Sequence, residues 1–362
     1  MSFRSRLAFA TTNAMVLVLI SACGDDPTAP PTQLWQDVSL PNLGAKGFMG
    51  IAARGSRVVA VGVAGSSAAR EPLAVQSTGG TWQALTLPAT PAEALFVGVA
   101  IDVSGSVVFV GVRAAEQPIV LDERAGWQTA TLPVTGYLNA VVAGQSGTWI
   151  AVGTASGGLA ATSTAPGVWV PDNAGFTTLQ EKGLVDVTHA DSAFVACGWD
   201  DTSLGPVLRI HDNTGWKALD GPGTVNVPEI SEEYRSVLLE PGGALWLGGA
   251  SIDTSQFPAD YSARLARRPA SGDWFEVVLP NATNVEAIND ILRASDGSLY
   301  LACGENTARV LRYDGMIFHD EGPGTPGQVL ALAEDGAGRI YAAGVLESGT
   351  SDPQPLLRVR NP

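Results

Sequence analysis

The chain has 362 residues, of which 21 are basic and 36 are acidic, so its formal net charge is −15. Repulsion from phosphate groups makes nucleic acid and bare anionic membrane surfaces unsuitable partners. With 42 Gly, 23 Pro, 45% hydrophobic residues and 16% charged residues, the composition predicts a folded, turn-rich chain and excludes an extensively disordered one.

The first 22 residues have the pattern of a bacterial export signal. Arg4 and Arg6 form a basic start, and Ala14 to Ile20 form an apolar run too short to span a bilayer, which needs about 20 residues. This run leads into Ile20-Ser21-Ala22-Cys23, which resembles the lipobox of bacterial lipoproteins. The resemblance implies that residues 1–22 are removed and that Cys23 carries a lipid, so that the membrane is a partner through that lipid.

Residues 23–33 then read as the lipidated cysteine and a flexible tether, because they are rich in Pro, Asp and Thr. Buried acyl chains hold a protein on a membrane at about 0.8 kcal/mol per CH₂ group. Gly24 stands where lipoproteins retained in the inner membrane of enteric bacteria carry Asp. The comparison favours the outer membrane over the inner one as the place of anchoring.

Residues 34–362 repeat one Trp-marked unit seven times. The marker opens the segments at Trp35, Trp82 and Trp127, each followed within six residues by Leu-Pro, and it recurs 42 to 58 residues apart. The further copies are Trp169, Trp216, Trp274 and a degenerate Ile317-Phe318. A second marker, an apolar run that closes on glycine, has the same period and falls at Gly62, Gly111, Gly153, Gly198, Gly248, Gly304 and Gly344.

Each unit reads as four short strands without a helix, as the second unit shows at Phe96–Ile101, Val107–Val112, Pro118–Glu123 and Trp127–Leu132. Four strands in about 40–50 residues predict the blade of a β-propeller. The last unit has three strands, and Trp35–Leu40 supplies a strand without inner neighbours. The predicted fold is therefore all-β, a seven-bladed β-propeller of four-stranded antiparallel blades, closed where the N-terminal strand joins the C-terminal blade. The Trp side chains are expected to fill the wedge between blades.

The segments Ser77–Trp82 and Asp122–Trp127 look like degraded Asp-boxes, a turn motif of propeller hairpins. Through these weak motifs the chain from Trp35 onward resembles bacterial propeller lipoproteins with kelch-like, sialidase-repeat-like or photosystem-assembly-factor-like blades. The motif is a turn device and implies no catalytic role.

No catalytic residue and no metal site is predicted. Cys197 and Cys303 fall in different blades, too far apart for a disulfide, and no Cys or His stands at ligand spacing from them. No cofactor is expected. A structural calcium ion at Asp200, Asp201 or Asp253 is conceivable, because hard cations bind clustered oxygens, but no calcium-binding motif supports it.

The long connections point to a binding face. Connections that leave the second and fourth strands of a blade share one face, and there lie Pro171–Gly183, Asp220–Glu233 and Gly249–Asp260, with shorter ones at Asp200–Gly205 and Val345–Gln354. Aromatic and acidic side chains on rigidly held loops suit recognition. The predicted binding face comprises Phe176, Trp199, Asp200, Asp201, Glu232, Glu233, Asp253, Asp260 and Tyr261.

The expected function is a monomeric, membrane-anchored, non-catalytic scaffold of the cell envelope that binds a protein or a glycan through the long-loop face. Two alternatives stay open. One is a propeller glycoside hydrolase or lyase that acts at the channel mouth, for which the residues around Tyr234-Arg235 and Arg293 offer only a fragment of the required cluster. The other is an adaptor in outer-membrane assembly, which rests on fold and anchor alone.

Overall fold

The computed structural model describes residues 34–362 except 67–68, 89–93, 115, 146, 156–157, 175, 177–182, 201–204, 213, 224–229, 256–258, 281–284, 323 and 348–352. In these residues every regular element is a β-strand. No helix in this part of the chain has the length and apolar character needed to cross a membrane.

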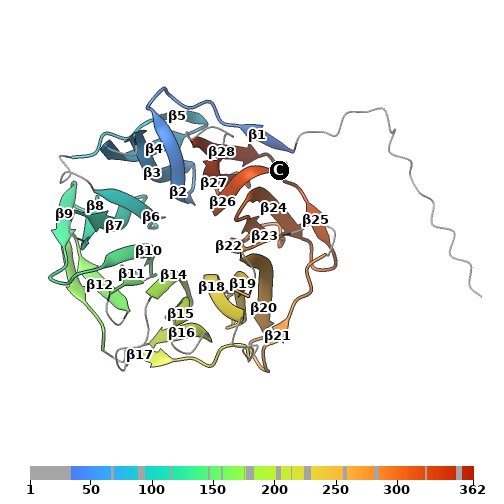
Figure 1. Cartoon of the computed structure of the whole chain (residues 1–362). Helices are drawn as coiled ribbons and strands as arrows, with labels where there is room; N and C mark the ends of the chain where they lie inside the picture. Colours follow the sequence, from blue (N-terminus) through green and yellow to red (C-terminus); the bar gives the residue numbers. More distant parts are fainter. Residues whose placement is uncertain are drawn as a thin grey trace, which may run out of the picture. The chain divides into compact units, whose positions relative to one another are not determined.

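Seven four-stranded antiparallel blades surround a central axis (Figure 1). In each blade the first strand lies nearest the axis and the fourth lies farthest from it. The innermost strands are β2 (Ala45–Arg54), β6 (Leu95–Ile101), β10 (Tyr137–Ala143), β14 (Gly183–Ala190), β18 (Ile230–Leu239), β22 (Ile288–Arg293) and β26 (Thr325–Glu334). The second strands are β3 (Arg57–Ser66), β7 (Val107–Arg113), β11 (Trp149–Thr154), β15 (Ala193–Asp200), β19 (Leu245–Asp253), β23 (Leu299–Cys303) and β27 (Ile340–Leu346). The third strands are β4 (Ala69–Thr78), β8 (Gln117–Asp122), β12 (Leu159–Ala165), β16 (Gly205–Asp212), β20 (Asp260–Arg268), β24 (Thr307–Tyr313) and β28 (Gln354–Arg360). The outermost strands are β5 (Thr81–Ala84), β9 (Gln128–Thr131), β13 (Val168–Pro171), β17 (Gly215–Ala218), β21 (Phe275–Glu276), β25 (Phe318–Asp320) and β1 (Trp35–Asp37).

Blades are numbered here from β2, so blade 1 is β2–β5 and blade 7 contains β26, β27, β28 and β1. The first strand of the chain completes the last blade, because β1 pairs with β28 through Trp35↔Arg360, Gln36↔Val359 and Asp37↔Arg358. The predicted closure of the ring is confirmed. Blades 6 and 7 are also joined by a short pairing of β24 with β26, at Thr307↔Pro326 and Ala308↔Thr325.

The core lies between blades, because each blade buries both faces against its neighbours. The second strands are therefore almost wholly apolar, as in Val107–Val110 and Trp149–Val152, where every residue is buried. Each of the apolar clusters around Phe48, Phe109 and Trp149 joins side chains of two adjacent blades.

The tryptophans of the repeat act as packing residues, as predicted. Trp35, Trp169 and Trp216 are buried, and Trp82, Trp127 and Trp274 are partly buried against core clusters. Trp127 stacks on Phe109 with ring centroids 5.5 Å apart. The bulk of an indole ring fills the gap that widens between blades with distance from the axis.

Candidate functional site

A β-bulge at the same place in every innermost strand builds the wall of the central channel. The register of the first strand against the second shifts at this place in each blade, with a second shift between Ala45 and Gly47 in blade 1, and the bulge residue lines the channel. The seven bulge residues are Met49, Val97, Asn139, Val185, Arg235, Asn289 and Leu330. All fall within the first six residues of their strands, which start at the long-loop face.

In six blades a glycine of the second strand faces the bulge. Gly62 and Gly111 each pair with the residue just before the bulge, and a Cβ on either would overlap a carbonyl oxygen of the bulged strand. In these blades the glycine permits a close approach of the two backbones. In blade 5 the position belongs to Gly249 and not to the predicted Gly248, because Gly249 pairs with Tyr234 before the bulge. In blade 6 Cys303 holds it instead of Gly304.

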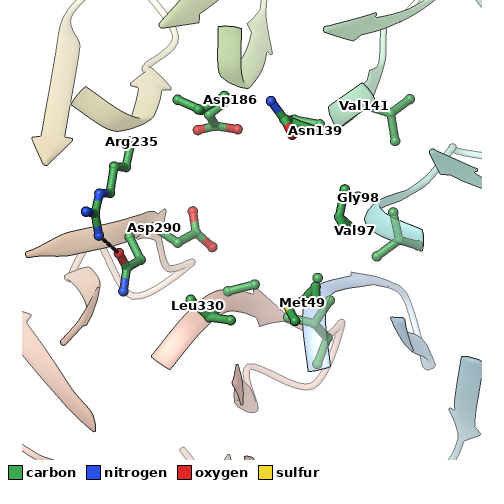
Figure 2. Close-up of a pocket in the computed structure, with 16 residues that line it drawn as sticks. Met49, Val97, Gly98, Asn139, Val141, Asp186, Arg235, Asp290 and Leu330 are labelled. Carbon is green, nitrogen blue, oxygen red and sulfur yellow. Dashed lines mark hydrogen bonds between the residues drawn. The ribbon is translucent and has the colours of Figure 1, made fainter. Parts of the chain in front are cut away.

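The bulge residues and their neighbours line a channel cavity of about 160 Å³. Figure 2 shows Arg235 and Asp290 on one side of it, across from Val97 and Gly98. The channel is thus amphipathic: its charged and polar side chains come from blades 3 to 6, and blades 7, 1 and 2 supply an apolar wall that includes Met49. A space of this size holds water molecules or one side chain.

Arg235 is the charged centre of the polar wall. Its guanidinium donates to Glu305 Oε2 at 2.7 Å, to Asn289 Oδ1 at 3.1 Å and to Glu233 Oε2 at 3.1 Å. Glu305 lies between β23 and β24, in a connection of the long-loop face. The arginine is therefore fixed at the long-loop end of the channel by groups from two blades.

Two aspartates occupy the position that follows the bulge, Asp186 in blade 4 and Asp290 in blade 6. Asp186 accepts from the Val237 backbone N–H at 2.9 Å, and Asp290 accepts from the Leu332 N–H at 2.7 Å. The Ser236 hydroxyl lies between them, 3.1 Å from Asp186 Oδ2 and 3.4 Å from Asp290 Oδ1.

The hydrogen bond from Val237 to Asp186 joins blade 5 to blade 4, and the one from Leu332 to Asp290 joins blade 7 to blade 6. Burial raises the pKa of Asp186. Burial, and then the charge of Asp186, raise the pKa of Asp290 to about 7. The pair therefore retains protons at pH values where an exposed aspartate has lost its own.

A raised pKa beside a cavity is a mark of catalytic acids, and these carboxyls are also hydrogen-bonded within the protein. Val187 N–H donates to Asp186 Oδ1 and Ile291 N–H to Asp290 Oδ1, so all four carboxyl oxygens accept hydrogen bonds from the protein. Glu286 is likewise used, since it accepts from three successive backbone N–H groups of residues 305–307. Hydrogen bonding of this kind holds the channel wall in a fixed geometry.

The predicted binding-face residues that the structure describes gather at the long-loop ends of blades 4 and 5. Trp199 is the last residue but one of β15, Asp253 ends β19, and Asp260 and Tyr261 start β20. Asp253 and Asp260 stand opposite each other in the β19–β20 register, and Asp253 also accepts from the Ser255 N–H and hydroxyl. These residues form the outer part of the face, radially outside the channel mouth.

Phe176 and Glu232 have packing roles. Phe176 lies 5.6 Å from the Trp216 ring and under the Arg209 guanidinium at 5.9 Å, and it packs against the apolar cluster shared by blades 3 and 4. Glu232 is 3% exposed and pairs with Arg264 at 3.2 Å.

Glu233 instead pairs with Arg235 at the channel. The neighbouring glutamates thus serve different arginines and do not form a convergent carboxylate pair.

Several predicted residues fall outside what is described. Cys23 and Asp201 lie outside the described residues, and of Asp200 only the backbone at the end of β15 is described. Within the described part of the chain, no group of three or more His, Cys, Asp or Glu residues is arranged to hold a metal ion. Cys197 and Cys303 are free and fully buried, and burial raises the pKa of both thiols.

Of the bulge residues, the sequence analysis named only Arg235, as part of the fragment weighed for a hydrolase at the channel mouth. The bulge side chains share no chemistry, so no pattern of residue types marks the others. The signal that could have found them is positional, because each bulge residue precedes its blade's glycine-marker position by 13 or 14 residues.

Comparison with known proteins supports the fold and adds no family. No family model matches the chain, and no curated protein matches it. Among solved structures, a YCF48 propeller bound to a D1 peptide superposes with a TM-score of 0.60 at 16% identity, covering 92% of this chain and 98% of that one. The WD40 propeller of Doa1 gives 0.60 at 12% identity, covering 90% and 96%. Hydrazine synthase of Kuenenia stuttgartiensis gives 0.57 at 12% identity, covering 86% and 96%.

Proposed function

We propose that this chain is an exported lipoprotein that acts as a non-catalytic scaffold at the bacterial cell envelope and binds a protein through its long-loop face. The observation that carries the proposal is the channel mouth. There an arginine fixed by Glu233, Glu305 and Asn289 faces an apolar wall that includes Met49, which is 37% exposed. A rigid surface that joins apolar area to an oriented charge is the composition of a protein interface.

Binding is favoured over hydrolysis because the carboxylates at this mouth already serve as structural acceptors. Retaining and inverting glycosidases need two carboxyl groups free to act on a sugar held between them. Here Asp186 and Asp290 hold neighbouring blades together, and the cavity between them measures about 160 Å³.

A protein partner is favoured over a glycan at this face by one comparison. The YCF48 propeller, which has the same general fold, was solved bound to a D1 peptide. At 16% identity the support is an analogy at the level of fold. It gives no identity to the partner of this chain.

Anchoring is tested by separating membrane and soluble fractions of cells that express the chain. Lipid on Cys23 should place the wild type in the membrane fraction and allow it to incorporate labelled palmitate. Cys23→Ser should lose the label and leave that fraction, whereas Thr28→Ala should behave as the wild type. Equal membrane association of the Cys23→Ser variant would contradict the lipid anchor.

The binding face is tested by site-specific photocrosslinking in cells. A photoreactive phenylalanine analogue is placed at Tyr137, 36% exposed at the long-loop start of β10, and in a matched chain at Val103, 75% exposed in the β6–β7 hairpin of the opposite face. We expect a discrete protein adduct from position 137 and none from position 103.

Arg235→Met should reduce the adduct from position 137, because it removes the oriented charge. An adduct from position 103 alone would refute the long-loop face. An adduct with an outer-membrane assembly component would favour the adaptor role. Absence of any adduct, together with glycan hydrolysis by the purified chain, would favour the hydrolase.

A further inference from the structure

A second and larger cavity lies at the seam where the ring closes, between blade 7 and blade 1. It measures about 580 Å³, within the range of small-molecule sites. One wall is β1 with the residues after it, Asp37–Pro41; the second is the β4–β5 hairpin with Trp82; the third comes from β27 and the end of β28. This seam cavity extends from the β4–β5 hairpin and Arg339, at the short-hairpin end of the blades, along the chain that follows β1.

Its floor is aromatic and apolar. Trp82 meets Tyr341 edge-to-face with ring centroids 6.0 Å apart. Tyr341 is 2% exposed, and its hydroxyl donates a hydrogen bond to Asp335. The Tyr341 ring is therefore held in place against the Trp82 indole. Trp82 is only partly buried and lines the cavity together with Leu40 and Val359.

The rim of the seam cavity is polar and its charges are compensated. Asp37 pairs with Arg358 at 2.6 Å, and Arg339 pairs with Asp335 at 2.6 Å. The other polar rim residues are uncharged and exposed, namely Ser39, Thr81 and Asn361.

We propose that the seam cavity binds a neutral oligosaccharide, with one sugar ring against the Trp82 indole and its hydroxyls on the polar rim. A pyranose has an apolar C–H face that packs on an aromatic ring, and hydroxyls around its edge that need donors and acceptors. The seam cavity offers both in one place. An ionic ligand finds no uncompensated partner charge there, and a lipid chain would meet Ser39, Thr81 and Asn361 where it needs apolar wall.

The site also couples binding to closure of the ring. The ligand would contact β1 and blade 1 at once, and β1 is otherwise paired through three residues of β28. A bound sugar should therefore raise the melting temperature of the protein as well as being detected directly. This readout does not depend on the protein partner proposed for the other face.

The test uses the full lipidated chain in detergent micelles with three probes, chitotriose, cellotriose and maltotriose. Saturation-transfer NMR detects binding, and calorimetry measures the affinity. We expect at least one probe to bind and to raise the melting temperature. Trp82→Ala should weaken that binding by about tenfold or more, and Ser39→Trp, a rim substitution that fills the cavity from solvent, should abolish it.

Trp127→Ala is the matched control, since Trp127 holds the equivalent place in blade 2 and is stacked on Phe109; it should keep the affinity within about twofold. If Trp82→Ala does not fold, Ser39→Trp and Asn361→Ala decide the question, because both positions are exposed. Binding of none of the three probes, or an affinity unchanged in the rim variants, would overturn the proposal.

Discussion

At the scale of single residues, the position that follows the bulge joins neighbouring blades in two different ways around the ring. The residue after the bulge is Gly or Ala in blades 1, 2, 3 and 7, and a Cβ on Gly50 would come within 2.6 Å of the Val97 carbonyl oxygen of the next blade. In blades 4, 5 and 6 the same position is Asp186, Ser236 and Asp290, whose side chains bond the backbone of the next blade. Blades are thus joined either by close backbone contact or by a side-chain bridge.

The raised pKa of Asp290, which joins blade 6 to blade 7, predicts an unusual dependence of the protein's stability on pH. Its folded pKa of about 7 lies above the unfolded value near 3.8, so between these values the folded state binds more protons than the unfolded one. Stability contributed by this group is present at low pH and falls as pH rises through 7.

Replacing Asp290 with Asn removes the titration. The free energy of unfolding of the wild type should therefore fall relative to Asp290→Asn between pH 5 and pH 8, by on the order of 1–3 kcal/mol. Urea denaturation followed by circular dichroism at each pH measures it, with the exposed Asp260→Asn as control. A difference between wild type and Asp290→Asn that stays constant with pH would contradict the assignment.

At the scale of strands, the bulge in each innermost strand supplies the side chains that line the channel. A regular first strand would present alternate residues to its two neighbouring blades and leave none for the axis. The extra residue turns one side chain of each blade inward, and in six of the blades the facing glycine makes room for the displaced backbone.

Gly111→Ala tests this element. The new Cβ would overlap the Leu95 carbonyl oxygen, so we expect the unfolding free energy to fall by about 1–3 kcal/mol. Gly223→Ala, where a Cβ would meet nothing within 4 Å, should change it by less than about 0.5 kcal/mol. Denaturant titration of both variants measures the difference, and equal stabilities would show that the bulge tolerates a side chain.

At the scale of the whole molecule, the ring depends on its closing strand. Trp35 is 3% exposed and packs with Tyr300, Ile340 and Leu356 in a cluster shared by blades 6 and 7. Trp35→Ala should therefore cost about 3–5 kcal/mol of unfolding free energy. Leu34→Ala, at a position 47% exposed, should cost little. Denaturation curves and protease susceptibility of the two variants test this. Similar curves would mean that the ring is stable without the packing of Trp35.

The architecture could be read from the sequence because its signals are periodic. The Trp period gave the number of blades, and a last unit with three strands beside an unmatched N-terminal strand gave the closure, which the Trp35↔Arg360 pairing confirms. The channel could not be read in the same way. Asp186, Ser236 and Asp290 are 50 and 54 residues apart, and only the curvature of the ring brings their side chains together.

The predicted binding face stays a prediction, and the structure gives only the positions of its described residues. Loop length located the long-loop ends of blades 4 and 5, where Trp199 and Asp253 lie. Composition could not separate residues used in packing, such as Phe176 and Glu232, from those that face solvent. Trp82 is the opposite case, since its packing role was predicted and its place in the wall of the seam cavity was not.

The three-residue pairing of β1 with β28 has a mechanical consequence. Cys23 precedes Trp35 by twelve residues, so in a lipid-anchored chain any tension between the membrane and a bound partner passes through β1 before it reaches the ring. Under load this strand should detach first and leave six blades complete, and it should re-form when the force is released. The molecule would then yield at a defined point, with the seam cavity beside it opening as the strand departs.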